Sequence, residues 1–135
     1  MLRRLCFAFL LITALPLLSG LQAAERIIRF DSDITVNADA SLDVVETIEV
    51  QAEGQSVRRG IFRDIPTTYS DRFRNRIRVE LEVLRVERDG TAEPYVLEKL
   101  RNGIRIRIGN ANRLLEYGPH SYRIQYRTTR QLGFF

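Results

Sequence analysis

The chain has 135 residues, with 21 lysines and arginines against 17 acidic residues and a formal charge of +4 at neutral pH. This length fits one ordinary domain, and the nearly balanced charge gives no electrostatic basis for nucleic-acid binding. A single cysteine excludes both an intrachain disulfide framework and a zinc site built from cysteines.

The beginning of the chain has the order of residues found in a secretory signal. Arg3 and Arg4 form a short basic start, residues 5–18 are apolar and uncharged, and small residues follow. A basic start, an apolar run and small residues before the cleavage position are typical of signal peptides. We therefore expect cleavage after Ala23 and export of everything that follows.

The expected domain organisation is a signal peptide over residues 1–23 and one domain over residues 24–135. The alternative is an uncleaved anchor, because a membrane span needs about 20 apolar residues and residues 5–24 just reach that length. Both alternatives place the domain in the periplasm or on the extracellular face of the cytoplasmic membrane. Cleavage would lower the formal charge from +4 to +2 and remove Cys6, leaving no thiol.

Residues 26–52 are predicted to form a β-hairpin. Apolar and polar residues alternate with period two on both sides of residues 37–41, which are rich in turn-forming types. The apolar faces of the two strands carry Ile28, Phe30, Ile34 and Val36, then Leu42, Val44, Ile48 and Val50.

The segment at residues 58–66, RRGIFRDIP, interrupts this alternation. We interpret it as a motif loop that crosses between strands. In this interpretation Gly60 permits a bend, Pro66 ends the segment, and three apolar side chains anchor it. The motif loop consists of Gly60, Ile61, Phe62, Arg63, Asp64, Ile65 and Pro66, with Ile61, Phe62 and Ile65 as the anchors.

Further strands are predicted to follow, with turns at residues 88–90 and 101–103. Residues 77–87 are expected to form one strand with a β-bulge at Val83–Leu84, after which Leu84 and Val86 continue the apolar face. Shorter strands are expected near residues 95–100, 104–108 and 121–127. Six or seven short strands, each with one polar face, favour an all-β fold, an antiparallel β-sandwich of immunoglobulin-like architecture preceded by a signal helix.

Glu46 lies on the apolar face of its predicted strand, between Val44 and Ile48. A buried carboxylate is costly unless it is paired and hydrogen-bonded, so the sequence must supply a cation. We expect Arg63 to be that cation, or Arg59 if Arg63 does not reach. The Glu46–Arg63 ion pair is a structural hypothesis, not a catalytic one.

Several arginines form a basic stretch around and after the motif loop. On the surface they could contact anionic lipid head groups or polymers of the cell envelope. The alternative is an ordinary solvated face, paired with acids such as Glu80 and Glu82. The arginines proposed for these contacts are Arg58, Arg59, Arg72, Arg74 and Arg76.

The sequence carries little that indicates catalysis. His120 is the one histidine, in a Gly-Pro-His segment that we interpret as a partly exposed turn, and serine-nucleophile and phosphate-loop signatures are absent. We expect no cofactor, no metal and no catalytic residue. The alternative is a cell-envelope hydrolase or transferase that uses paired carboxylates such as Asp31 and Asp33.

Three stretches resemble the YciQ-like family of predicted bacterial membrane proteins, in the exported N-terminal domain of unknown function. They are DASLDVVETIEV at residues 39–50, RRGIFRDIP at 58–66 and HSYRIQYR at 120–127. The resemblance implies a β-rich module followed by transmembrane helices, with no established enzymatic activity. The chain departs from the family at Ala40, where glycine is usual, and it resembles only the front part of a member.

We therefore expect an exported, non-catalytic β-sandwich module with a binding or scaffolding role at the cell envelope. Its expected partners are envelope or membrane components, or the transmembrane part of a longer protein, and not nucleic acid. The alternatives are the carboxylate enzyme described above and a non-functional truncated fragment. The ligand and the oligomeric state stay open.

Overall fold

The computed structural model describes residues 26–129, and every regular element in this range is a β-strand. The all-β, antiparallel part of the prediction is confirmed, whereas the signal peptide, its helix and the C-terminal residues 130–135 lie outside the described residues. Nothing between residues 26 and 129 is a helix that could cross a membrane. The strands are β1 (Arg26–Val36), β2 (Leu42–Ala52), β3 (Gly60–Pro66), β4 (Thr68–Ser70), β5 (Arg76–Arg78), β6 (Leu81–Arg88), β7 (Thr91–Ala92), β8 (Tyr95–Lys99), β9 (Gly103–Gly109) and β10 (Gly118–Thr128).

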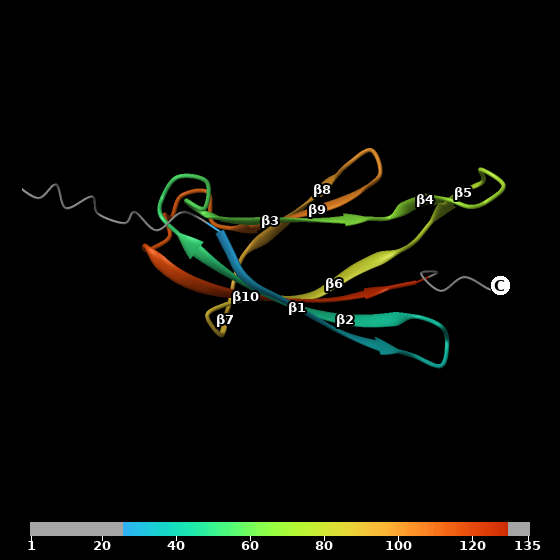
Figure 1. Cartoon of the computed structure of the whole chain (residues 1–135), viewed down its shortest axis with the longest axis horizontal. Helices are drawn as coiled ribbons and strands as arrows, with labels where there is room; N and C mark the ends of the chain where they lie inside the picture. The colour runs from blue at the N-terminus through green and yellow to red at the C-terminus, as the bar shows by residue number, and fades with distance from the viewer. Residues whose placement is uncertain (1–25, 130–135) are drawn as a thin grey trace, which may run out of the picture.

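The strands form two larger sheets and one small hairpin. The larger sheet has five strands in the order β1-β2-β10-β6-β7, and the second has three in the order β3-β9-β8. Figure 1 shows the three-stranded sheet lying across one face of the five-stranded sheet, with the β4–β5 hairpin projecting at one end. All pairings are antiparallel.

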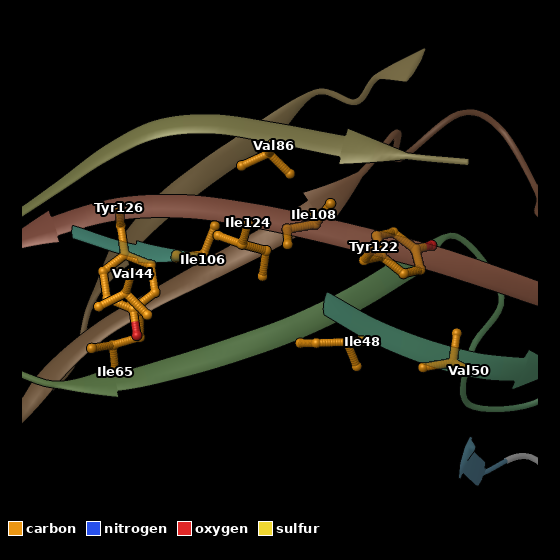
Figure 2. Close-up of a cluster of buried hydrophobic side chains, with 10 residues drawn as sticks. All are labelled: Val44, Ile48, Val50, Ile65, Val86, Ile106, Ile108, Tyr122, Ile124 and Tyr126. Atoms are coloured by element: carbon orange, nitrogen blue, oxygen red, sulfur yellow. The ribbon is translucent and has the colours of Figure 1, made fainter. Parts of the chain in front are cut away.

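The hydrophobic core lies between the two larger sheets. Strands β2 and β10 pair over their whole length, and alternate residues of both strands are buried. Figure 2 shows these side chains meeting those of β3, β6 and β9. The core consists of Val44, Ile48, Val50, Ile65, Val86, Ile106, Ile108, Tyr122, Ile124 and Tyr126.

The predicted first hairpin is present. The amide of Asn37 donates to the carbonyl of Ser41 at 2.9 Å, and β1 pairs with β2 on either side of this turn. A register shift at residues 27–29 changes the expected face, because Ile27, not Ile28, lies opposite Val50. Phe30 and Ile34 lie opposite Ile48 and Val44, as the alternation requires.

The prediction of one strand over residues 77–87 is wrong. The chain leaves the β4–β5 hairpin at Arg78, buries Val79, whose amide donates to the carbonyl of Thr67 at 2.9 Å, and enters β6 at Leu81. The expected bulge is present, since Arg85 pairs with Gln125 and Val83 with Tyr126. Leu84 is the extra residue and is exposed, so it does not continue the apolar face.

The motif segment is a strand rather than a loop. Residues 60–66 form β3, an edge strand that pairs along its whole length with β9. Ile65 is buried and Ile61 packs against the core, but Phe62 is 63% exposed and anchors nothing, because it points to the outer face of its sheet. At Gly60, where φ is 148°, a Cβ atom would lie 1.7 Å from the carbonyl oxygen of Ile108. Only glycine permits this close approach of β3 to β9.

Candidate functional site

Glu46 is buried on the inner face of β2, with only 2% of its surface exposed. Two residues donate hydrogen bonds to its carboxylate. Arg63 Nε lies 2.6 Å from Oε2 and Arg63 Nη2 lies 2.6 Å from Oε1, while the hydroxyl of Tyr126 lies 2.9 Å from Oε1. The structure therefore brings Arg63 and Glu46 together, as the ion-pair hypothesis requires, and adds Tyr126, which sequence reasoning missed.

The ion pair links the edge of the three-stranded sheet to the five-stranded sheet. Arg63 belongs to β3 and its guanidinium also lies 5.5 Å from the centre of the Phe30 ring on β1. The hydrogen bond to Glu46 raises the pKa of Arg63 above its ordinary value. Burial, together with the charge of Glu46, raises the pKa of the Tyr126 hydroxyl. Both shifts keep the Arg63 guanidinium and the Tyr126 hydroxyl protonated, so that both can donate hydrogen bonds to Glu46.

Beside this ion pair, a groove of about 400 Å³ runs between β1 and β3. Its apolar lining comes from both sheets and includes Ile27, Phe30, Ile48, Val50 and Ile61. Arg26 and Arg63 also line it. The groove thus combines an apolar surface with cationic groups, a composition found in ligand-binding sites.

The apolar face of β1 is uncovered next to this groove. Its side chains lie opposite buried residues of β2, yet they are 48–63% exposed. The reason is that the three-stranded sheet ends at β3, so no strand of the described chain lies over β1. The exposed side chains of this face are Ile27, Phe30, Ile34 and Val36.

Sequence reasoning could not detect this uncovered face, because period-two alternation is identical for covered and uncovered strands. The number of strands in the opposing sheet decides the outcome, and residue patterns do not contain that number.

The predicted basic stretch is divided between two places. Arg58 and Arg59 lie directly before β3, whereas Arg72, Arg74 and Arg76 belong to the β4–β5 hairpin at the other end of the molecule (Figure 1). Among residues 26–129, no carboxylate lies within ion-pair distance of Arg26, Arg58 or Arg59. The end of the groove next to Gly60 therefore carries arginines that have no ion-pair partner among the described residues.

A second polar cluster, unpredicted from the sequence, lies where β6, β7 and β10 meet. Asp89 accepts a hydrogen bond from the amide of Ser121 at 2.8 Å and lies 2.7 Å from Nδ1 of His120. Burial opposes the charged form of Asp89, but these hydrogen bonds keep its pKa below the usual range. The expectation of a turn at His120 is wrong, because the residue lies within β10, and it is half-buried, with a side chain that is 10% exposed.

This second cluster also holds a buried acid. Glu93 lies 3.1 Å from Nε of Arg88 and 3.6 Å from Nη2 of Arg113. Within the part of the chain that the structure describes, no three metal-ligating side chains converge. Asp31 and Asp33 lie opposite Thr47 and Val45, on the face of β1 that points away from the groove, and Asp31 pairs with Arg29 at 2.5 Å.

The sequence is similar to one described protein family and to one curated protein. Residues 26–135 match the family described as "Predicted membrane protein (DUF2207) N-terminal domain". The uncharacterized protein YciQ of Escherichia coli (strain K12) is 31% identical over 102 residues, which are 76% of this chain and 16% of YciQ. The chain thus spans about a sixth of the length of this curated relative.

One solved structure has a similar fold. Native leukotriene A4 hydrolase from Saccharomyces cerevisiae matches with a TM-score of 0.54 and 20% sequence identity, over 79% of this chain and 15% of that chain. At this level of identity the match concerns the fold alone.

Proposed function

The chain belongs to the family of predicted membrane proteins described by this N-terminal domain, and from that premise we propose that it is an exported, non-catalytic binding module of the cell envelope. We also propose that its two sheets form a β-sandwich of immunoglobulin-like architecture, since side chains of both meet in one core. The proposed role is to bind or hold an envelope or membrane component.

The observation that carries this proposal is the uncovered apolar face of β1 next to the groove. Monomeric soluble proteins rarely leave contiguous apolar surface exposed unless it is an interaction site. Here Ile27, Phe30, Ile34 and Val36 are all exposed on one strand, and the Arg63 guanidinium at the groove is already neutralised by Glu46. The exposed face of β1 is therefore suited to contact with an apolar partner.

The carboxylate-based enzyme alternative gains no support from Asp31 and Asp33. They lie on the opposite face of β1 from the groove, and Asp31 is already paired with Arg29. A pair of catalytic carboxylates needs a concave site between them. The buried acids Glu46 and Glu93 are both held by arginines, an arrangement typical of structural ion pairs.

Thiol labelling in cells tests the proposal. The chain has one cysteine, so a Cys6→Ser background gives each introduced thiol a unique signal. Phe30→Cys reports on the groove, and Val96→Cys on the outer face of β8, 50% exposed against 48% for Phe30, is the matched control. We expect a membrane-impermeant maleimide to label both variants equally in purified full chain, but only Val96→Cys in intact cells, where the groove is occupied.

Two results would contradict this proposal in different ways. Equal labelling of both thiols in cells would mean that the groove has no occupant. Labelling of Val96→Cys only after lysis would mean that the domain is not exported.

A further inference from the structure

The strand β3 has a backbone edge directly above the groove, on which the carbonyl of Asp64 accepts a hydrogen bond from Arg63 Nη1 at 2.7 Å. It pairs with β9 on one side, and no described strand pairs with its other side. Such an edge presents N–H and C=O groups in the spacing of a β-ladder, and it is a template for another extended chain. The edge is seven residues long, Gly60–Pro66.

An additional strand at this edge would lie over the uncovered face of β1. The Glu46–Arg63 contact places β3 over β2, so the next position in the three-stranded sheet is over β1, the neighbour of β2. Inward side chains of that strand would contact Phe30 and Ile34, which are now exposed. One added strand would therefore satisfy the backbone edge and cover the apolar face together.

We propose that the groove binds an extended polypeptide segment, which adds to β3 as a fourth strand and places alternate apolar side chains on β1. This inference rests on the proposed binding function and names the class of partner. The mode is β-strand addition, in which backbone hydrogen bonds give affinity and side-chain pockets give specificity.

A second copy of this chain does not fit the same position. In a symmetric dimer formed by β3 against β3, the partner's β1 would occupy the space that β2 fills beneath β3. A lipid surface could cover Phe30 and Ile34, but acyl chains cannot pair with the amides and carbonyls of β3. A polypeptide strand satisfies both requirements.

Charge indicates the composition of the segment. Arg58 and Arg59 precede Gly60, Arg26 lies at the same end of the groove, and none has a carboxylate partner within residues 26–129. Arg63 is neutralised by Glu46 in the middle of β3. The segment should therefore carry an acidic residue at the Gly60 end and neutral residues elsewhere.

The experiment uses synthetic seven-residue peptides with the purified full chain. The probe alternates valine and threonine with an aspartate at one end, and it is prepared with the aspartate at either end. One control replaces aspartate by lysine, and another is N-methylated at alternate residues, which removes the hydrogen bonds of one edge without removing apolar surface. Amide hydrogen exchange of residues 61–65 reports the pairing.

We expect the acidic peptide to slow exchange at alternate amides of β3 by about tenfold, and both controls to bind at least about tenfold more weakly. Phe30→Asp should abolish binding, whereas Val96→Asp on the outer face of β8 should not. Both replaced side chains are exposed, so both variants should fold.

Vesicles of phosphatidylglycerol and phosphatidylethanolamine provide the competing class of partner. Vesicle binding that requires Phe30, without exchange protection by any peptide, would overturn strand addition and leave the proposed binding function intact. Peptide binding that the N-methylated control reproduces would also overturn it. Binding of neither probe, with Phe30→Cys fully labelled in cells, would contradict both proposals.

Discussion

At the scale of single residues, the buried carboxylate of Glu46 decides the structure of the motif. A charge at this position is tolerated because Arg63 and Tyr126 donate to both of its oxygens. The motif therefore turns one guanidinium inward from an edge strand, while its neighbour Asp64 turns outward to Arg105 at 2.7 Å. Arg63 and Asp64, although adjacent in sequence, thus form ion pairs on opposite faces of β3.

Removing the inward guanidinium should destabilise the fold far more than removing the outward one. Arg63→Met leaves a buried carboxylate without its cation, which costs about 3 kcal/mol, near the low end for buried pairs because Arg63 is partly exposed. Arg105→Met removes an exposed pair on the outer face of the same sheet, where solvent screens both charges, and should cost much less. Urea unfolding measures both free energies, and equal values would mean that Glu46 is not dependent on Arg63.

The exposed ion pair between Asp43 and Arg127 gives a prediction for pH. Hydrogen bonds from Arg127 at 2.7 Å and from Asn37 at 3.0 Å lower the pKa of Asp43 to about 2. Because the folded pKa lies below the ordinary aspartate value of 3.8, this carboxylate stabilises the fold above pH 4, and the contribution is lost as the pH falls towards 2.

A carboxyl-carbon NMR titration checks this pKa directly. Arg127→Gln should move the Asp43 midpoint up towards 3.8. Arg123→Gln, on the same face of β10 but 3.7 Å from Glu87 instead, should leave it unchanged. A midpoint near 4 in the unaltered protein would contradict the observed pairing.

At this scale the sequence predicted Glu46 with Arg63, because a charge on an apolar face is a local anomaly that requires a partner. It could not predict the contact between His120 and Asp89, since both residues fit ordinary turns and lie 31 positions apart. A polar residue that does not interrupt the alternation of apolar and polar residues gives no indication of which residue it contacts.

At the scale of elements, the sequence predicts the positions of turns well and the points at which strands end poorly. The hairpin over residues 26–52 and the turn at Gly103 formed as predicted, because local backbone preferences determine such turns. The break between β5 and β6 was missed, since the alternation continues through Val79 while the hydrogen bonding does not. Sheet partners, not residue patterns, decided where that strand ended.

The β1–β2 turn yields a stability prediction. Ala40 has φ of 63°, in the left-handed region that costs an L-residue about 1 kcal/mol. Ala40→Gly should therefore raise the free energy of unfolding by about 0.5 kcal/mol, after the greater flexibility of glycine in the unfolded chain is subtracted. Ala52→Gly, at a buried strand position without such strain, is the control and should destabilise. Thermal unfolding of both variants tests the assignment, which a lower melting temperature for Ala40→Gly would contradict.

At the scale of the whole molecule, the two sheets are unequal in width, and this inequality explains the exposed apolar face. The five-stranded sheet is wider than the three-stranded sheet. Strand β1 therefore carries the alternating apolar side chains of a core strand, but no described strand lies over them. The chain also spans only 16% of YciQ, so full-length relatives contain much additional polypeptide. An extended segment that completes the smaller sheet could come from such a polypeptide or from a separate protein.

The same architecture predicts a gradient of local stability. Strand β10 lies between β2 and β6 and carries the fully buried Tyr122 and Ile124, so its amides should exchange only on global unfolding. The β4–β5 hairpin pairs with no other strand between residues 26 and 129 and exposes Phe73 and Ile77, so local opening should expose its amides.

Native-state hydrogen exchange should therefore give protection at least about 100-fold lower in β4–β5 than in β10, with β1 between them because it has one partner strand and an uncovered face. An occupant on β3 should raise the protection of β1 and β3 but not that of β4–β5. Uniform protection across all strands would contradict this gradient, because it would mean that the hairpin unfolds only with the core.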